Sequence, residues 1–170
     1  SSSLTFSISG GADQAKFIIN QFTGDLSFLI APDYENPTNA GANNVYEVTL
    51  RASDGLFYEE QTLSVMVTDV NEPPSISSDG AGATASLSVA ENQTAVTTVS
   101  GIDPDSGTTL TFSISGGADQ AKFQIGPSSG VLSFLSAPDF ENPSDTDADN
   151  IYVVMARVSD SSALFDEQTI

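Results

Sequence analysis

The stretch Leu-Thr-Phe-Ser-Ile-Ser-Gly-Gly-Ala-Asp-Gln-Ala-Lys-Phe occupies Leu4–Phe17 and occurs again, without a change, at Leu110–Phe123. Two copies 106 residues apart make the chain a tandem array. A period of this length is too long for one turn of a solenoid, and it fits a self-contained domain with its own core. The repeat therefore predicts a string of similar domains rather than one large fold.

The register of the repeat persists beyond the identical stretch. The sequence Gly-Asp-Leu-Ser-Phe-Leu at 24–29 matches Gly-Val-Leu-Ser-Phe-Leu at 130–135, and Ala-Pro-Asp-Tyr-Glu-Asn-Pro at 31–37 matches Ala-Pro-Asp-Phe-Glu-Asn-Pro at 137–143. We expect one domain over residues 1–72 and a second over residues 73–170. By comparison of the copies, we expect the first to lack its first strands and the second its last strand, as in a window cut from a longer array.

Apolar residues alternate with a period of two along several short runs. Leu110, Phe112 and Ile114 occupy every second position, and the runs are bounded by Gly, Asn, Asp or Pro. About seven such runs per repeat, with no sustained helical pattern, predict an all-β fold in which each domain is a Greek-key β-sandwich. In the second copy we expect strands near 86–90, 94–101, 110–115, 122–126, 131–135, 150–159 and 166–170.

The charge of the chain is strongly negative. It has 23 acidic and four basic residues, which give a net charge of −19. Such a charge opposes contact with nucleic acid or anionic membranes and favours cations as partners. Hydrophobic residues make up 39% of the chain and follow a regular β pattern, so we expect a packed core rather than disorder. No run of about 18 apolar residues occurs, and we expect no membrane insertion.

Most catalytic chemistry is excluded by composition. The chain has no Cys, His or Trp, so it has no disulfide, no thiolate or imidazole metal ligand, and no Ser-His or Cys-His nucleophile. A glycosidase with paired carboxylates would need two acids flanking a cleft, whereas these acids gather at predicted strand ends and in the linker. We therefore expect that the protein is not an enzyme.

Acidic residues occur in closely spaced pairs. Examples are Asp33 with Glu35 and Asp103 with Asp105, each pair two residues apart. In extended or turn backbone this spacing directs both carboxylates to the same side, which is unfavourable unless a cation joins them. Ca²⁺ takes six to eight oxygen ligands and needs no nitrogen or sulfur, so it is the cation that this composition favours.

Five short motifs together resemble those of cadherin repeats, and the resemblance covers nearly the whole chain. In the order of a repeat, they are Ala90-Glu91-Asn92, similar to the glutamate of the first strand; Asp103-Pro104-Asp105, similar to Asp-x-Asp; Asp33-Tyr34-Glu35, similar to Asp-Arg-Glu; Ala52-Ser53-Asp54-Gly55, similar to Ala-x-Asp-x-Gly; and Asp69-Val70-Asn71-Glu72-Pro73-Pro74, similar to the inter-repeat linker. The Gly-, Ser-, Ala- and Asn-rich, Lys-poor composition is most similar to cadherin-like repeats of large bacterial secreted or surface proteins.

The resemblance implies calcium ions between consecutive repeats. The ligands it implies at the junction are Asp33 and Glu35 of the first copy, Asp69, Val70 through its backbone oxygen, Asn71 and Glu72 of the linker, and Asp103, Asp105 and Asp160 of the second copy. At the far end of the second copy it implies Glu91, Asp139 and Glu141. We expect this three-acid set to bind Ca²⁺ more weakly, because it lacks the ligands of a following linker.

The function implied is that of a calcium-rigidified extracellular repeat, a structural extender in an adhesin or surface fibre. Its partners would be neighbouring repeats of the same chain and like chains in a fibre, through paired strand edges. The alternative is a polysaccharide-binding cadherin-like module of a secreted carbohydrate-active protein. Either would be secreted or at the cell surface.

One further acidic run differs between the copies. Asp145-Thr-Asp147-Ala-Asp149 begins like an EF-hand loop, but the Gly expected at the sixth position is Asn150 and the Glu expected at the twelfth is Ala156. The first copy has Thr-Asn-Ala-Gly-Ala-Asn-Asn at 38–44, which has no acid. We interpret the run as an ordinary loop. Any ion there would bind to the second copy only.

Overall fold

The structure is a computed structural model that describes residues 3–170. The chain divides into two compact units, one ending at Val70 and the other running from Asn71 to Ile170. Within residues 3–170, no helix is long and apolar enough to span a membrane.

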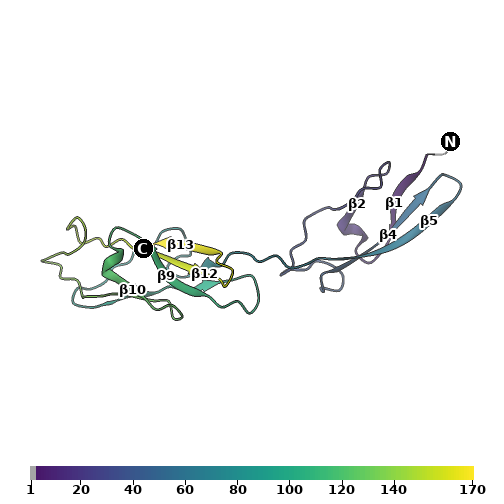
Figure 1. Cartoon of the computed structure of the whole chain (residues 1–170). Helices are drawn as coiled ribbons and strands as arrows, with labels where there is room; N and C mark the ends of the chain where they lie inside the picture. The colour runs from purple at the N-terminus through teal and green to yellow at the C-terminus, as the bar shows by residue number, and fades with distance from the viewer. Residues whose placement is uncertain (1–2) are drawn as a thin grey trace. The chain divides into compact units, whose positions relative to one another are not determined.

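Over its described residues, 3–70, the first unit is built of five strands and one short 3-10 helix. Two groups of strands form. In one, β1, β4 and β5 pair in that order in an antiparallel sheet (Figure 1). In the other, β2 pairs with β3. The element bounds are β1 Thr5–Gly10, η1 Gln14–Lys16, β2 Phe17–Ile19, β3 Leu26–Phe28, β4 Val45–Ser53 and β5 Tyr58–Met66.

The second unit repeats this plan and adds strands that precede it. One sheet has the order β13-β12-β9, a second has the order β10-β11-β7, and β6 pairs with β8. In Figure 1, β9, β12 and β13 lie side by side. The bounds are β6 Ser75–Ile76, β7 Ala95–Thr98, β8 Gly101–Ile102, β9 Thr111–Gly116, η2 Gln120–Lys122, β10 Phe123–Ile125, β11 Val131–Phe134, β12 Met155–Ser159 and β13 Phe165–Thr169.

Each unit has its own apolar core, built from equivalent residues. In the first unit Phe17 stacks on Phe28 with ring centroids 4.6 Å apart, and Tyr46 meets both rings edge-on. In the second unit Phe123 stacks on Phe134 at the same distance. Around this pair lie fully buried aliphatic residues, namely Leu132, Val154, Ala156 and Val158. The two cores confirm the predicted all-β sandwich.

Of the strands expected in the second unit, one does not form and another is shorter than expected. Residues 86–90 form no strand, and of the expected 150–159 only Met155–Ser159 is one. A strand needs a partner for its backbone groups. Before residues 86–90, the chain makes one parallel bridge, between Thr84 and Thr169, and this pairing does not continue into 86–90. Before β12, Val154 exchanges two backbone hydrogen bonds with Ile170 (2.8 and 3.0 Å). No further strand lies beside either segment among the described residues.

A buried aspartate in the repeated stretch fixes a loop to the sheet in each unit. Asp119 is 3% exposed and accepts hydrogen bonds from the backbone amides of Thr146 and Val153, both at 2.8 Å, and from the Thr146 hydroxyl. Asp13 holds Ala40 and Glu47 of the first unit in the same way. The sequence pattern gave no sign of this structural role, because the Asp follows a turn-like Gly-Gly.

Replacing Asp119 with Asn should destabilise the second unit by about 1–3 kcal/mol at neutral pH, because an amide NH₂ would face donors where an oxygen now accepts. Burial by itself raises the pKa of Asp119, but hydrogen bonds from Val153 and Thr146 outweigh it and hold this pKa below the ordinary 3.8. The carboxylate therefore contributes stability above pH 3.8 that is lost as the pH falls through the lowered folded-state value. Urea unfolding at pH 7 and pH 3 checks this: the gap between variant and wild type should narrow at pH 3, and an equal gap at both would contradict it.

Candidate metal centre

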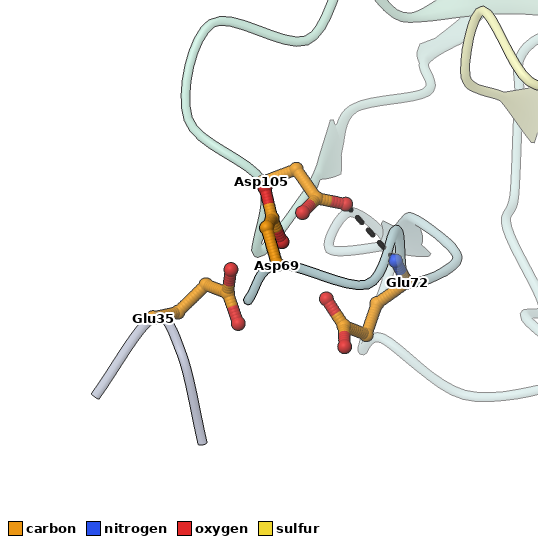
Figure 2. A group of neighbouring side chains, drawn as sticks. All are labelled: Glu35, Asp69, Glu72 and Asp105. Atoms are coloured by element: carbon orange, nitrogen blue, oxygen red, sulfur yellow. Dashed lines mark hydrogen bonds between the residues drawn. The ribbon is translucent and has the colours of Figure 1, made fainter. Parts of the chain in front are cut away.

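Acidic and amide side chains from three segments meet at one end of the second unit. Asn71 donates from Nδ2 to Oδ2 of Asp160, just after β12, at 2.6 Å. The backbone amide of Glu72 donates to Oδ2 of Asp105 at 3.0 Å, the bond drawn in Figure 2. Asp103 accepts from the amide of Asp105 at 2.9 Å, within the loop between β8 and β9. The start of the unit is thus tied to two loops that lie far from it in the sequence.

Two carboxylate oxygens in this group are buried and accept no hydrogen bond from the described residues. They are Oδ2 of Asp103 and Oδ1 of Asp105. A buried acceptor with no donor is costly, and a buried carboxylate is stable only when it is paired or coordinates a metal. Among the described residues, no Lys or Arg forms an ion pair with Asp103 or Asp105; the ion pairs found are Arg51 with Glu60 and Arg157 with Glu167. An all-oxygen set of this kind fits Ca²⁺.

The two carboxylate oxygens of Asp160 have different partners. Its Oδ1 accepts from the amides of Ser162 (2.9 Å) and Leu164 (2.8 Å), which shapes the turn between β12 and β13, and its Oδ2 faces Asn71. Asp54 closes the equivalent turn of the first unit by accepting from Leu56 and Phe57. Hydrogen bonds from the Phe57 and Leu56 amides lower the pKa of Asp54. This motif therefore has a local structural role in both units.

In the first unit, the predicted ligands lie at the end that leads into the linker. Glu35 and Asp69 are exposed, and each places a carboxylate oxygen within 4.8 Å of the other's. Asp33 lies outside this pair and uses Oδ1 to accept from the amide of Asn36 at 3.1 Å. Val70, the last residue of the unit, is 69% exposed.

The three remaining predicted ligands come together within the second unit. Glu91, Asp139 and Glu141 are exposed and offer carboxylate oxygens within 4.8 Å of one another. Oε2 of Glu91 accepts from the amide of Phe140 at 3.0 Å, which joins the segment after residue 90 to the loop after β11. The group is a second possible cation site, more open than that of Asp103 and Asp105.

The chain is similar in sequence to two human proteins. Protocadherin-23 is 31% identical over 122 residues, which is 71% of this chain and 3% of that protein. Protocadherin Fat 4 is 32% identical over 143 residues, which is 81% of this chain and 3% of that protein. No protein-family model matches the chain. The chain thus spans only a small part of the length of these relatives.

Two solved structures of similar fold are a Drosophila and a mouse cadherin. The Drosophila N-cadherin EC1-4 structure has a TM-score of 0.65 and 19% identity, covering 99% of this chain and 40% of that chain. The mouse cadherin-23 EC22-24 structure has a TM-score of 0.56 and 25% identity, covering 98% of this chain and 51% of that chain.

Proposed function

We propose that this chain, which consists of cadherin-like repeats, is a calcium-stiffened part of an extracellular adhesion-type protein. Ca²⁺ held where one repeat leads into the next would restrict the angle between them. The observation that carries the proposal is the pair of buried, unpartnered oxygens on Asp103 and Asp105 beside the linker residue Glu72.

The proposed ligands come from both repeats and from the linker. They are Asp33, Glu35 and Asp69 of the first unit, the backbone oxygen of Val70, the linker residues Asn71 and Glu72, and Asp103, Asp105 and Asp160 of the second unit. Covalent connection supports this sharing: Asp69 and Glu72 are three residues apart, so their Cα atoms are at most about 11 Å from each other.

The proposed mechanical effect follows from charge. Without a cation, the carboxylates of the two units repel one another across a short linker, which widens the range of angles between the repeats. A shared Ca²⁺ would supply positive charge that neutralises this repulsion. Its binding free energy would then favour those angles at which ligands from both sides reach it.

An array of such repeats would act as an extender that holds a binding tip away from the cell. We propose a secreted or cell-surface location, with neighbouring repeats and like chains as partners. The Gly-, Ser-, Ala- and Asn-rich, Lys-poor composition leads us to propose a bacterial surface protein as the parent.

Calcium titration by calorimetry tests the proposed function. We expect a tighter binding class at the linker and a weaker class at Glu91, Asp139 and Glu141, because the latter set has three exposed acids and completes its shell with water. Glu91→Gln should remove binding at this three-acid set and leave the tighter class unchanged. No heat of binding at millimolar Ca²⁺, or loss of the tighter class in the Glu91 variant, would contradict the assignment. Glycan-array binding by the chain would instead favour the alternative prediction of a polysaccharide-binding module.

A further inference from the structure

The loop between β11 and β12 of the second unit contains a separate cluster of acids. Asp145, Asp147 and Asp149 each place a carboxylate oxygen within 4.8 Å of the others. Asp147 and Asp149 are exposed, but Asp145 is only 8% exposed. The negative charge of Asp149 raises the pKa of Asp147, with smaller contributions from burial and from Asp145. Three like charges therefore crowd one short loop.

One oxygen of the buried acid has no donor. Oδ2 of Asp145 accepts a hydrogen bond from the amide of Asp149 at 2.8 Å, whereas Oδ1 is buried and accepts none from the described residues. Asp149 uses its own Oδ1 to accept from the amide of Ile151 at 2.8 Å. The cluster thus accepts hydrogen bonds from two backbone amides, those of Asp149 and Ile151, and leaves a buried, negatively charged acceptor beside further acceptors.

In the first unit, an uncharged side chain occupies the position equivalent to Asp145. Asn39, 6% exposed, replaces Asp145, and its Oδ1 accepts from the amide of Asn43 at 3.2 Å. Its Nδ2 donates to Oδ1 of Asn43 at 2.7 Å and to the carbonyl oxygen of Val45 at 2.9 Å. The Nδ2 group of Asn39 is therefore a donor with two acceptors, and both polar atoms of this side chain are hydrogen-bonded within the loop.

The two loops otherwise have similar backbone conformations. Ala42 and Ala148 both have positive φ (46° and 62°), and so do Asn44 and Asn150 (62° and 67°). The Asn at the end of each loop donates from Nδ2 to a carbonyl oxygen ten residues earlier, that of Tyr34 or Phe140. The difference between the loops is therefore chemical: the second presents an acceptor where the first presents an NH₂ donor.

We propose that the loop 145–149 of the second unit binds Ca²⁺, with the carboxylates of Asp145, Asp147 and Asp149 as its protein side-chain ligands. In the first unit the two Nδ2 hydrogens of Asn39 lie between acceptor oxygens. A cation bound in the second unit would supply the positive charge that the oxygens of this loop lack. Ca²⁺ fits best among common cations, since the ligands are all oxygen and water can complete an irregular shell. The site uses no residue of the linker group and is absent from the first repeat.

The two loops supply a matched test. The variant Asp145→Asn/Asp147→Gly/Asp149→Asn replaces the three proposed ligands with the residues at the equivalent positions of the first loop. The positive φ values that the two loops share indicate that the second loop can accommodate them. In the wild-type full chain, titration with CaCl₂ followed by amide NMR should shift the signals of Asp149 and Ile151. The variant should lose these shifts and bind one Ca²⁺ fewer by calorimetry, while retaining the shifts at Glu72.

Two results would overturn the proposal. One is unchanged wild-type amide signals over residues 145–151 up to about 10 mM Ca²⁺, which is above the range of weak extracellular sites. The other is an unchanged number of bound ions in the triple variant. The single variant Asp147→Gly removes an exposed side chain only, and it should weaken the loop site at least about tenfold; it decides the question if the triple variant does not fold.

Discussion

Replacing Asp103 and Asp105 together with Asn should weaken Ca²⁺ binding at the linker at least about tenfold and reverse its effect on stability. Each Asn keeps an oxygen for the existing hydrogen bonds, to the amides of Asp105 and Glu72, but loses a negative charge. With Ca²⁺ present, the variant should melt below the wild type because two charged ligands are lost. In chelator it should melt at the same temperature or higher, because like-charge repulsion is relieved.

A matched control separates ligand loss from a general change of net charge. Glu47→Gln/Glu59→Gln removes the same two charges from exposed positions on β4 and β5 of the first unit. This control should bind Ca²⁺ as the wild type does, by calorimetry and by melting with and without chelator. Equal Ca²⁺ affinity in all three proteins would show that Asp103 and Asp105 are not ligands.

Two adjacent glycines in the repeated stretch, Gly116 and Gly117, should differ strongly in how far alanine at their position destabilises the second unit. Gly117 has a φ of +106°, and an added Cβ would lie 2.4 Å from the carbonyl oxygen of Val153 and 2.5 Å from Cα of Val154. Both neighbours are backbone atoms at the edge of the core and cannot move aside. Gly117→Ala should therefore destabilise the second unit by at least about 3 kcal/mol.

Gly116→Ala is the matched control for this variant. Its Cβ would meet Met155 side-chain atoms no closer than 3.8 Å, and its φ is not in the positive region. We expect a change in the free energy of unfolding within about 1 kcal/mol. Chemical denaturation of the two variants compares them directly. Similar stabilities would mean that the backbone of Val153 and Val154 does not approach Gly117 closely.

The sequence predicted the sandwich well where side chains alternate and a partner strand exists. The alternating run expected at 110–115 forms β9 at Thr111–Gly116. Residues 86–90 alternate equally well but form no strand. The alternating pattern indicates which face of a segment is apolar, but it does not indicate whether a backbone partner lies beside that segment. The two-residue strands β6 and β8 are too short for any periodicity to reveal.

The acidic motifs predicted which residues gather, but not how each oxygen is used. Glu91 does lie with Asp139 and Glu141, and Asn71 does reach Asp160 across 89 residues of sequence. That Asp33 accepts from its own turn, or that Asp119 is a buried structural acid, depends on backbone geometry that spacing does not encode. The incomplete EF-hand pattern at 145–149 indicates an ordinary loop, because sequence spacing does not show that Oδ1 of Asp145 is buried without a hydrogen-bond donor.

Small-angle scattering of the wild-type chain, in saturating Ca²⁺ and then in excess chelator, shows whether Ca²⁺ restricts the angle between the two repeats. We expect the profile in Ca²⁺ to fit a narrow range of angles between the two repeats, and the profile in chelator to require a broad range, while circular dichroism shows the β-sandwiches still folded. Superimposable profiles in the two conditions, with Ca²⁺ binding verified by calorimetry on the same sample, would contradict the account.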